Sequence, residues 1–482
     1  MKLAVIGGGI AGLSAAYYAL RSKKYEEITI LESSSRWGGK IVTERVPFDG
    51  GQFIIEGGPD TFLAAKPWGV ALCQELGLAD RLHGTNPRQK NTYVLHKNQL
   101  QPLPDGLALM IPTDIPSILK SQLVSWPGKL RMGLDFLLPA HNGHHDESLG
   151  GFVSRRLGRE AYEALIEPLM SGIYAGDGDQ LSLQSTFPYL RDLEARHGSL
   201  ARGALAMRKK MPAAPGSRSA FLTPTTGLAE IVEALIESLT ENGADLRLNA
   251  PALRITKYAF RYLVELEAGK TLEADSVILA APAPVSGRLL ASLDPELASV
   301  LGSIPYASTA TVTLAYRQGD LSRPLDGYGY VIPRREGRRA LACTWTSTKF
   351  PHRAPEGYVL LRVFVGRAGE SPSPLGRPPD GGRWDRGEGA ILALARQEIE
   401  LTLGVTAEPL VSRVFTWENA MPQYNLGHPE KLARIEAALQ NHPGLALAGN
   451  GYRGIGIPDC IHSGEMAVDT VLRNRAGEPA SC

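Results

Sequence analysis

The chain has 482 residues, of which 43% are hydrophobic and 21% charged, and its formal net charge is +1. This length allows two or three domains with cores of their own. The small net charge excludes a general attraction to nucleic acid, so we expect no nucleic-acid partner. The four cysteines fit no metal-binding spacing, as is typical of a protein with reduced thiols, and no apolar run is long enough to span a bilayer.

The N-terminal stretch predicts a strand, a helix and a strand that bind a dinucleotide. An apolar strand is expected at 3–6, a helix at 11–24 and a second strand at 28–31. A GxGxxG sequence joins the first strand to the helix, in the order that this motif requires. Glu32 ends the second strand, where its carboxylate can accept hydrogen bonds from the adenosine ribose and repel a 2′-phosphate. This acid makes NADP the least expected ligand.

The three glycines of this motif each meet a steric need. Gly7 allows a tight turn out of the strand, Gly9 lets a diphosphate reach main-chain amides, and Gly12 lets the helix pack closely on the strand. The same glycines argue against a secretory signal peptide at Met1–Leu20, because they interrupt its apolar core. We therefore expect a mature N-terminus and a cytoplasmic protein.

Further glycine-rich stretches favour FAD over NAD. Arg36, Gly39 and Lys40 lie in the sequence RWGGK, and paired glycines follow at 50–51. An extended FAD needs main chain beside its pyrophosphate and ribityl chain, although paired glycines also form ordinary hairpins. The stretch EGGPDTF at 56–62 then predicts a stiff bend with exposed amides along the flavin edge. The residues of this bend expected to contact the cofactor are Gly57, Gly58, Pro59 and Asp60.

The middle of the chain is expected to be helical. Between 107 and 138, short apolar pieces are interrupted by prolines and flanked by lysine and arginine. Such helices either lie in a membrane interface without crossing it or bury their apolar faces on one another, and both interpretations stay open. The histidines and acids at 141–147 fit a polar loop before a capped helix, so no metal is expected. A helix is predicted at 151–169, and the basic stretch 201–218 is either a mobile surface loop or a gate.

The remaining segments complete two sheets. Strands at 246–255, 262–266 and 276–281 are expected to return to the nucleotide domain, which is therefore discontinuous. Alternating apolar residues predict the strands of an antiparallel substrate-domain sheet, at 309–316, 327–332, 341–346 and 358–365, with a hairpin at 92–104. Near the C-terminus, a strand at 445–448 precedes a helix at 460–472. The N-terminus of that helix offers unpaired amides and partial positive charge to a reduced flavin.

The stretch RRLGREAYEALIEPLMSGIYAGDGDQLSLQSTFP at 155–188 resembles the central signature of the oxygen-dependent, FAD-containing porphyrinogen oxidases of heme synthesis. The GGPDTF bend, LACTWTSTKFPHRAP at 341–355 and GNGYRGIGIPDCIHSG at 449–464 belong to the same pattern. The resemblance implies an α/β fold with a Rossmann-like FAD-binding domain, an antiparallel-sheet substrate domain and a helical, membrane-facing or self-packed subdomain. Their expected ranges are, in this order, 1–85, 220–290 and 431–482; 86–105 and 291–430; and 106–219.

The resemblance also implies the reaction and some of its residues. A tetrapyrrole substrate would lose six electrons in three two-electron steps through FAD to oxygen, giving hydrogen peroxide. The backbone carbonyl of Gly172 would hold a pyrrole NH, and no side chain stands out as a general base. The implied cofactor contacts are Ala252 near the adenine, Trp417, Asn450, Ile455, Gly456 and Ile457.

Two features of the resemblance bear on the substrate. Thr92 stands where plant and animal protoporphyrinogen oxidases carry a carboxylate-binding arginine, and the PDCI sequence at 458–461 looks like that of Gram-positive bacterial coproporphyrinogen oxidases. We therefore expect coproporphyrinogen III, with protoporphyrinogen IX as the alternative. A flavin amine or carotenoid oxidase, or a non-enzymatic binding protein on the same scaffold, are more distant alternatives. The location would be cytoplasmic, or peripheral on the inner membrane.

Overall fold

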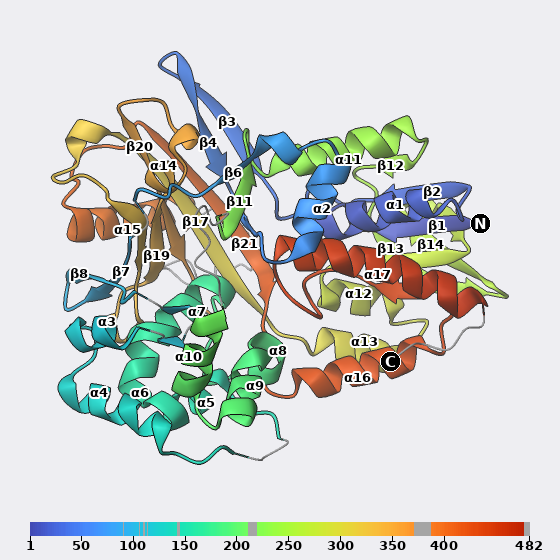
Figure 1. Ribbon diagram of the computed structural model, residues 1–482. Coiled ribbons are helices and arrows are strands. Elements are labelled where there is room, and N and C mark those ends of the chain that lie inside the picture. The colour runs from blue at the N-terminus through green and yellow to red at the C-terminus, as the bar shows by residue number, and fades with distance from the viewer. Residues whose placement is uncertain are drawn as a thin grey trace.

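The computed structural model describes residues 1–89, 91–105, 107–108, 111–112, 114–141, 145–210, 219–370 and 387–476. These residues form a parallel sheet with its helices, a larger mixed sheet, and a group of helices beside the larger sheet (Figure 1). The parallel sheet lies at the right of Figure 1, the larger sheet at the upper left and the helical group at the lower left.

The described strands of the parallel sheet come from three distant parts of the chain, in the order β12-β2-β1-β16-β22. Their bounds are β1 (Lys2–Ile6), β2 (Glu27–Leu31), β12 (Asp245–Arg247), β16 (Ser276–Leu279) and β22 (Leu445–Leu447). Leu3 and Val5 pack on one face against α1 (Ile10–Ser22), α11 (Ala229–Glu241) and α17 (Ile457–Ala476). Ala4 and Ile6 pack on the other face against the elements β13 (Ala252–Tyr258), β14 (Arg261–Leu266), β15 (Thr271–Ala274), α12 (Ala283–Leu290), α13 (Pro295–Gly302) and α16 (His428–Leu439). Because both faces are covered, the central strands are apolar over most of their length.

One predicted strand, 246–255, was wrong as a single element. It is two strands in different sheets, β12 in the parallel sheet and β13 in the antiparallel sheet β13-β14-β15. Between them the backbone of Asn249 has φ +50°, a conformation that asparagine tolerates better than most residues, and Pro251 follows. The chain therefore turns away from the sheet at this point.

The larger sheet is mostly antiparallel, as the alternating pattern predicted. Its described strands run in the order β21-β17-β20-β19-β18-β7-β8, and only the β18–β7 pair is parallel among them. Their bounds are β7 (Asn91–His96), β8 (Gln99–Pro102), β17 (Tyr306–Arg317), β18 (Gly327–Val331), β19 (Ala340–Trp345), β20 (Tyr358–Val365) and β21 (Val411–Pro422). One face packs on α15 (Glu388–Leu403) through an apolar cluster. Residues 371–386, in the stretch rich in glycine and proline between β20 and α15, lie outside the described residues.

The helical group has its own apolar core. Its helices are α3 (Ile115–Lys120), α4 (Trp126–Gly133), α5 (Leu149–Leu157), α6 (Arg159–Ala161), α7 (Glu167–Tyr174), α8 (Leu183–Thr186), α9 (Pro188–His197) and α10 (Leu200–Lys210). The single helix predicted at 151–169 was wrong. Gly158, with φ +92°, ends α5, and a π-helical turn at Tyr162–Ile166 precedes α7, where Pro168 has no N–H to donate.

The basic stretch 201–218 also differs from the prediction. Its first part is the helix α10 rather than a loop, and 211–218 lie outside the described residues. Within 141–147, residues 142–144 are likewise outside. In the part of the chain that is described, no three histidine, cysteine or acidic side chains gather as a metal site would require. No described helix combines the length and apolar character needed to cross a bilayer.

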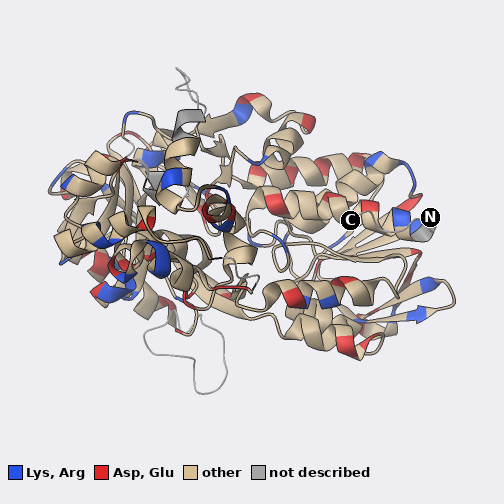
Figure 2. Cartoon of the chain, turned by 60° about the horizontal axis from the view of Figure 1, so that its bottom comes forward, with Lys and Arg blue, Asp and Glu red and all other residues tan. Residues whose placement is uncertain are grey.

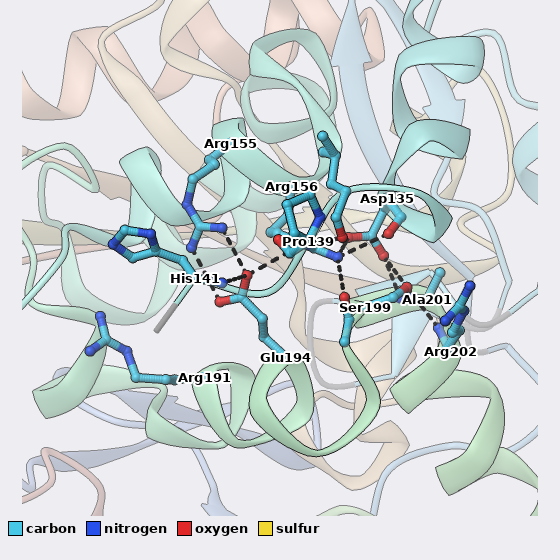
Figure 3. A network of polar contacts seen from close by, with 12 residues as sticks. Asp135, Pro139, His141, Arg155, Arg156, Arg191, Glu194, Ser199, Ala201 and Arg202 are labelled. Carbon is cyan, nitrogen blue, oxygen red and sulfur yellow. Dashed lines mark hydrogen bonds and ion pairs between the residues drawn. The ribbon is translucent and has the colours of Figure 1, made fainter. Parts of the chain in front are cut away.

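A buried polar network ties this helical group together (Figure 3). Arg156 and Asp135 have no exposed side-chain surface, and Arg156 Nε donates to Asp135 at 2.5 Å. Arg156 also donates to the carbonyls of Pro139 at 3.0 Å and Gly198 at 2.9 Å, and Ser199 donates to Asp135 at 2.6 Å. Glu194 lies on the other side, bonded to Arg155 and Arg156 in Figure 3. The network fixes the segment after α4 against α5, α9 and α10.

A hairpin near the N-terminus corrects the reading of the glycines at 50–51. Strands β3 (Thr43–Phe48) and β4 (Gly51–Glu56) pair, and Asp49 and Gly50 form the turn between them with φ +47° and +73°. These φ values are those of an ordinary hairpin turn. The loop at 38–40, and not this hairpin turn, contacts the glycine turn at 7–12.

Candidate functional site

The first glycine turn leaves main-chain amides accessible. Gly7 has φ +114°, and a Cβ on Gly12 would lie 1.9 Å from the Gly7 carbonyl, so neither position accepts a side chain. At Gly9, by contrast, the nearest atom to a built Cβ is Gly39 Cα at 3.9 Å. Helix α1 begins directly afterwards with no side-chain cap. Its free amides and partial positive charge suit a phosphate group.

Glu32 stands at the end of β2 beside this turn. Its carboxylate accepts hydrogen bonds from the backbone N–H of Gly8 at 2.7 Å and of Ser34 at 2.8 Å, and it keeps further lone pairs for ligand hydroxyls. The backbone N–H of Ala250 donates to the Glu32 carbonyl at 2.9 Å. Ala252, the first residue of β13, therefore lies near the same edge of the sheet.

The loop at 36–41 packs against the glycine turn. The backbone N–H of Gly38 donates to the Gly8 carbonyl at 2.8 Å. Arg36 folds back on its own loop, because its guanidinium donates to the carbonyls of Gly39 at 2.5 Å and Ile41 at 3.2 Å. The structure thus brings Arg36 and Gly39 to the predicted site, with Arg36 acting on the loop.

Lys40 connects this loop to two distant segments. Its Nζ donates to Asn450 Oδ1 at 3.4 Å and to the carbonyl of Ala420. Burial lowers the pKa of Lys40 to about 8. Among the described residues, no carboxylate lies within the 4.0 Å of an ion pair. Lys40 is therefore a half-buried cation without an acidic partner.

The bend at 57–60 lies against Lys40. A Cβ on Gly58 would be 1.8 Å from the Lys40 carbonyl, so the two backbones touch. The Gly57 carbonyl accepts hydrogen bonds from Thr311 Oγ1 at 2.7 Å and Trp417 Nε1 at 2.9 Å. Trp417 thus fixes the bend from β21, and Pro59 continues it.

Asp60 anchors the end of this bend. Burial opposes its negative charge, but Lys349 at 3.1 Å and the Arg362 charge prevail and lower the pKa of Asp60 to about 2. The carboxylate is therefore ionised throughout the neutral range. Its ion pair with Lys349 holds the bend against α14 (Thr346–Lys349).

The C-terminal segment closes the site from the other side. A Cβ on Gly464 would lie 2.4 Å from the Ala11 carbonyl, so α17 packs tightly on α1. Ile457 packs in the same core as Ile10 and Ala11 of α1, and Ile455 packs against the apolar core of the helical group. The helix starts at Ile457, three residues earlier than predicted, and the backbone N–H of Gly456 donates to Asp459 at 3.1 Å. The Asn450 carbonyl accepts from Tyr424 Oη at 2.6 Å.

Gly172 lies in α7, whose end contacts two other segments of the chain. Gln423 donates to the Tyr174 carbonyl at 2.9 Å, and Ala368 to the Ala175 carbonyl at 2.7 Å, so the end of α7 is held against β21 and the segment after β20. A Cβ on Gly172 meets no atom within 4 Å. Within the described residues, no hydrogen-bond donor reaches the Gly172 carbonyl. The Gly172 carbonyl is therefore an unpaired acceptor at the negative end of a helix, and the space where a Cβ would stand is open.

These features together fit a dinucleotide cofactor that carries negative charge. The accessible amides at α1 suit its diphosphate, Glu32 suits a ribose, and the half-buried cation of Lys40 lacks a partner that such a ligand would supply. The segments at 7–12, 38–40, 57–60, 417–420 and 450–457 meet although they are far apart in the sequence. The residues present therefore fit FAD.

Comparison with known proteins agrees with this geometry. A model of the family described as "Flavin containing amine oxidoreductase" matches residues 10–472. The chain belongs to this family. Members are oxidoreductases, and this family member is an FAD-dependent enzyme. A putrescine oxidase variant, 16% identical with a TM-score of 0.66 over 98% of each chain, has the same fold.

Several relatives within the family are more similar. The coproporphyrinogen III oxidase of Bacillus subtilis (strain 168) is 39% identical over 97% of each chain. The enzyme of the same name from Staphylococcus aureus (strain NCTC 8325 / PS 47) is 34% identical, covering 98% of this chain and 99% of that one. The human protoporphyrinogen oxidase is 32% identical over 97% of this chain and 98% of its own. A crystal structure from Exiguobacterium sp. 255-15 is 34% identical, with a TM-score of 0.82 over 98% of each chain.

Several residues that shape this candidate site were not predicted from the sequence. Thr311 and Arg362 hold the bend, and Gln423 holds α7. The alternation of β17 and β20 carries a usable signal, because Thr311 and Arg362 fall on the face opposite the apolar cluster under α15. An arginine inside the apolar run YVLLRVFV indicates a special environment.

Proposed function

We propose that the enzyme oxidises coproporphyrinogen III to coproporphyrin III, with oxygen as the electron acceptor and hydrogen peroxide as the second product. The observation that carries this proposal is the unpaired Gly172 carbonyl in the last turn of α7, where a built Cβ meets no other atom within 4 Å. A porphyrinogen offers pyrrole N–H groups, which are donors for such an acceptor. Relatives from three bacteria named coproporphyrinogen III oxidase, 32–39% identical, support the same substrate.

The chain's own residues would bind and orient both reactants. Gly7, Gly9 and Gly12 with α1 would hold the FAD diphosphate, and Glu32 its ribose, with Ala252 nearby. Bound FAD supplies the hydride acceptor and passes the electrons to oxygen. The remaining residues proposed to line the cofactor are Arg36, Gly39, Lys40, Gly57, Gly58, Pro59, Asp60, Trp417, Asn450, Ile455, Gly456 and Ile457.

In this proposal Gly172 positions the substrate. Its carbonyl lies in the last turn of α7, where the helix dipole adds partial negative charge. That partial negative charge strengthens a hydrogen bond from a pyrrole N–H to the carbonyl. It also stabilises the positive charge that develops as hydride leaves a neighbouring meso carbon. No side chain has to act as a base, since pyrrole protons can leave to solvent.

The alternative substrate is protoporphyrinogen IX, because the human and tobacco relatives are named protoporphyrinogen oxidase. The purified enzyme should be incubated under air with each porphyrinogen, and the initial rate followed by porphyrin fluorescence. We expect coproporphyrinogen III to give the higher kcat/KM. A clear preference for protoporphyrinogen IX would contradict the proposal, and turnover of amines without porphyrin formation would overturn it.

We also propose that the helical group makes peripheral contact with the inner membrane. Six large apolar side chains on α3, α4 and the turn after it are exposed by 45–79%, namely Ile115, Leu119, Trp126, Leu130, Leu134 and Leu137. In α4 and the turn after it, these side chains recur every three or four residues, so they share one face. Figure 2 shows basic and acidic segments intermingled on the molecule. Attraction would therefore come from the apolar side chains, with Lys129 beside the Trp126 ring at 4.7 Å.

Sedimentation with vesicles tests this contact. We expect the protein to co-sediment with liposomes of phosphatidylcholine and phosphatidylglycerol, and Leu130→Ser with Leu137→Ser to abolish it. The matched control Leu253→Ser with Leu401→Ser changes exposed leucines outside the helical group. Equal binding of both double variants would contradict a contact through this face.

A further inference from the structure

Arg362 differs from the other buried arginines of the described chain. Arg156, Arg353 and Arg367 each have a carboxylate partner, respectively Asp135 at 2.5 Å, Glu56 at 2.8 Å and Glu167 at 4.0 Å. Arg362 is 2% exposed, and no described carboxylate lies within 4.0 Å of its guanidinium. Burial lowers its pKa, against the more distant charges of Asp60 and Glu56. A buried cation without a direct counter-charge is unfavourable unless something else compensates it.

The contacts of Arg362 point towards the cofactor bend. It lies in β20 between Thr313 and Thr344 of the neighbouring strands and donates to the Gly58 carbonyl. Its guanidinium lies 4.7 Å from the ring centre of Phe364. Arg362 thereby fixes the Gly58 carbonyl, and the backbone of Lys40 touches the same residue.

Two carboxylates, Glu56 and Asp60, line a small internal cavity beside Arg362, but each is already paired, Glu56 with Arg353 at 2.8 Å and Asp60 with Lys349 at 3.1 Å. The Nε of Arg362 has no partner and lies by this cavity, where Thr313 Oγ1, Thr346 Oγ1 and Arg353 Nε are also unpartnered. The cavity has room for about one water molecule. A water could accept from the two Nε–H groups and donate to the two hydroxyls, which satisfies hydrogen bonding but adds no charge. The charge must be balanced elsewhere.

We propose that Arg362 is a positioning residue that fixes the bend at 57–60 and whose unpaired charge favours the reduced, negatively charged flavin. Hydride transfer adds two electrons and one proton to FAD and leaves it with one additional negative charge. Arg362, bonded to the Gly58 carbonyl, and Lys40, whose backbone touches Gly58, then supply positive charge near this bend without a direct carboxylate partner. This inference rests on the proposed contact between FAD and the bend.

The test is the reduction potential of bound FAD, measured by equilibration with a reference dye. We expect Arg362→Met to reduce the equilibrium constant for FAD reduction about tenfold, which is about 30 mV for a two-electron couple. Arg362→Lys should restore most of the potential, because it keeps the charge. Arg367→Met is the matched control, since Arg367 is equally buried and lies just beyond the same strand, and it should leave the potential unchanged.

The outcomes separate this inference from the proposed function. If all variants bind FAD and Arg362→Met has the wild-type potential, or if Arg367→Met lowers the potential equally, the role of Arg362 is refuted. If Arg362→Lys folds but shifts the potential as far as Arg362→Met, the charge is not the cause and the inference fails. If Arg362→Met cannot be isolated with FAD, the reduction potentials of Arg362→Lys and Arg362→Gln are compared instead. Absence of FAD from the wild-type protein would instead refute the proposed function.

Discussion

Lys40 and Asn450, 410 residues apart in the sequence, are joined by a hydrogen bond of 3.4 Å from Nζ to Oδ1. The same Nζ reaches the carbonyl of Ala420, so one cation connects the N-terminal loop, the end of β21 and the C-terminal segment. Three distant parts of the chain therefore depend on a single half-buried ammonium group. Its charge state should govern how well FAD binds.

We expect the affinity for FAD to fall as pH rises above about 8. The pKa of Lys40 is lowered by burial to about 8 without cofactor, and an anionic ligand would raise it again, so binding takes up a proton near this pH. In the FAD-free protein, raising the pH has the opposite effect, because it increases the stability of the fold. The buried charge destabilises the fold below pH 8, and the free energy of unfolding should rise between about pH 8 and 10.5, where the unfolded chain binds the extra proton.

Titration of the apoprotein with FAD from pH 7 to 10, followed by flavin fluorescence, measures this dependence. Lys40→Arg should retain binding across the range, and Lys40→Gln should bind weakly with no pH dependence. An unchanged pH profile in Lys40→Gln would show that another group titrates.

Glu32→Ala should loosen FAD. Hydrogen bonds to a charged group contribute roughly 1.5 to 3 kcal/mol each, so loss of one ribose contact should raise the Kd about ten- to hundredfold. Isothermal titration of apoprotein with FAD checks this. Glu27→Ala, an exposed acid at the start of the same strand, is the control, and unchanged FAD binding in Glu32→Ala would refute the ribose role.

Gly172→Ala should fold normally and impair the substrate step. A Cβ there meets no protein atom within 4 Å, and alanine favours a helix, so the melting temperature and flavin spectrum should be preserved. We expect the KM for coproporphyrinogen III to rise about tenfold, equivalent to ~1.4 kcal/mol, because the methyl group enters the open space. Gly133→Ala, also without neighbours at its built Cβ, should leave the KM unchanged.

Arg156→Met should strongly destabilise the protein. It removes one partner of a fully buried pair and leaves Asp135 uncompensated, a change that costs about 3–5 kcal/mol. Urea unfolding measures the difference. Arg159→Met, three residues later, breaks ion pairs of a side chain that is 54% exposed, so its effect should stay below about 1 kcal/mol. Similar losses in both variants would contradict a special role for the network of Figure 3.

The local features of the site could be read from the sequence. Gly7, Gly9, Gly12 and Glu32 lie within one strand–helix–strand unit, where steric rules act over a few residues and leave a recognisable spacing. The alternation in β17 and β20 likewise predicted the antiparallel sheet. Local rules failed where a single backbone angle decides the path, as at Asn249 and Gly158, since nothing nearby shows that the chain must leave one sheet or end one helix.

Sequence by itself determined the nucleotide unit, the FAD family and the stiff bend at 57–60, because each depends on residue types at short, fixed separations. Tertiary structure alone decided that Lys40 meets Asn450, that Arg362 lies under Gly58 without a carboxylate, and that the Gly172 carbonyl stays unpaired. These relationships depend on burial and on contacts between segments hundreds of residues apart. Desolvation and charge balance act through space, and the order of residues does not display them.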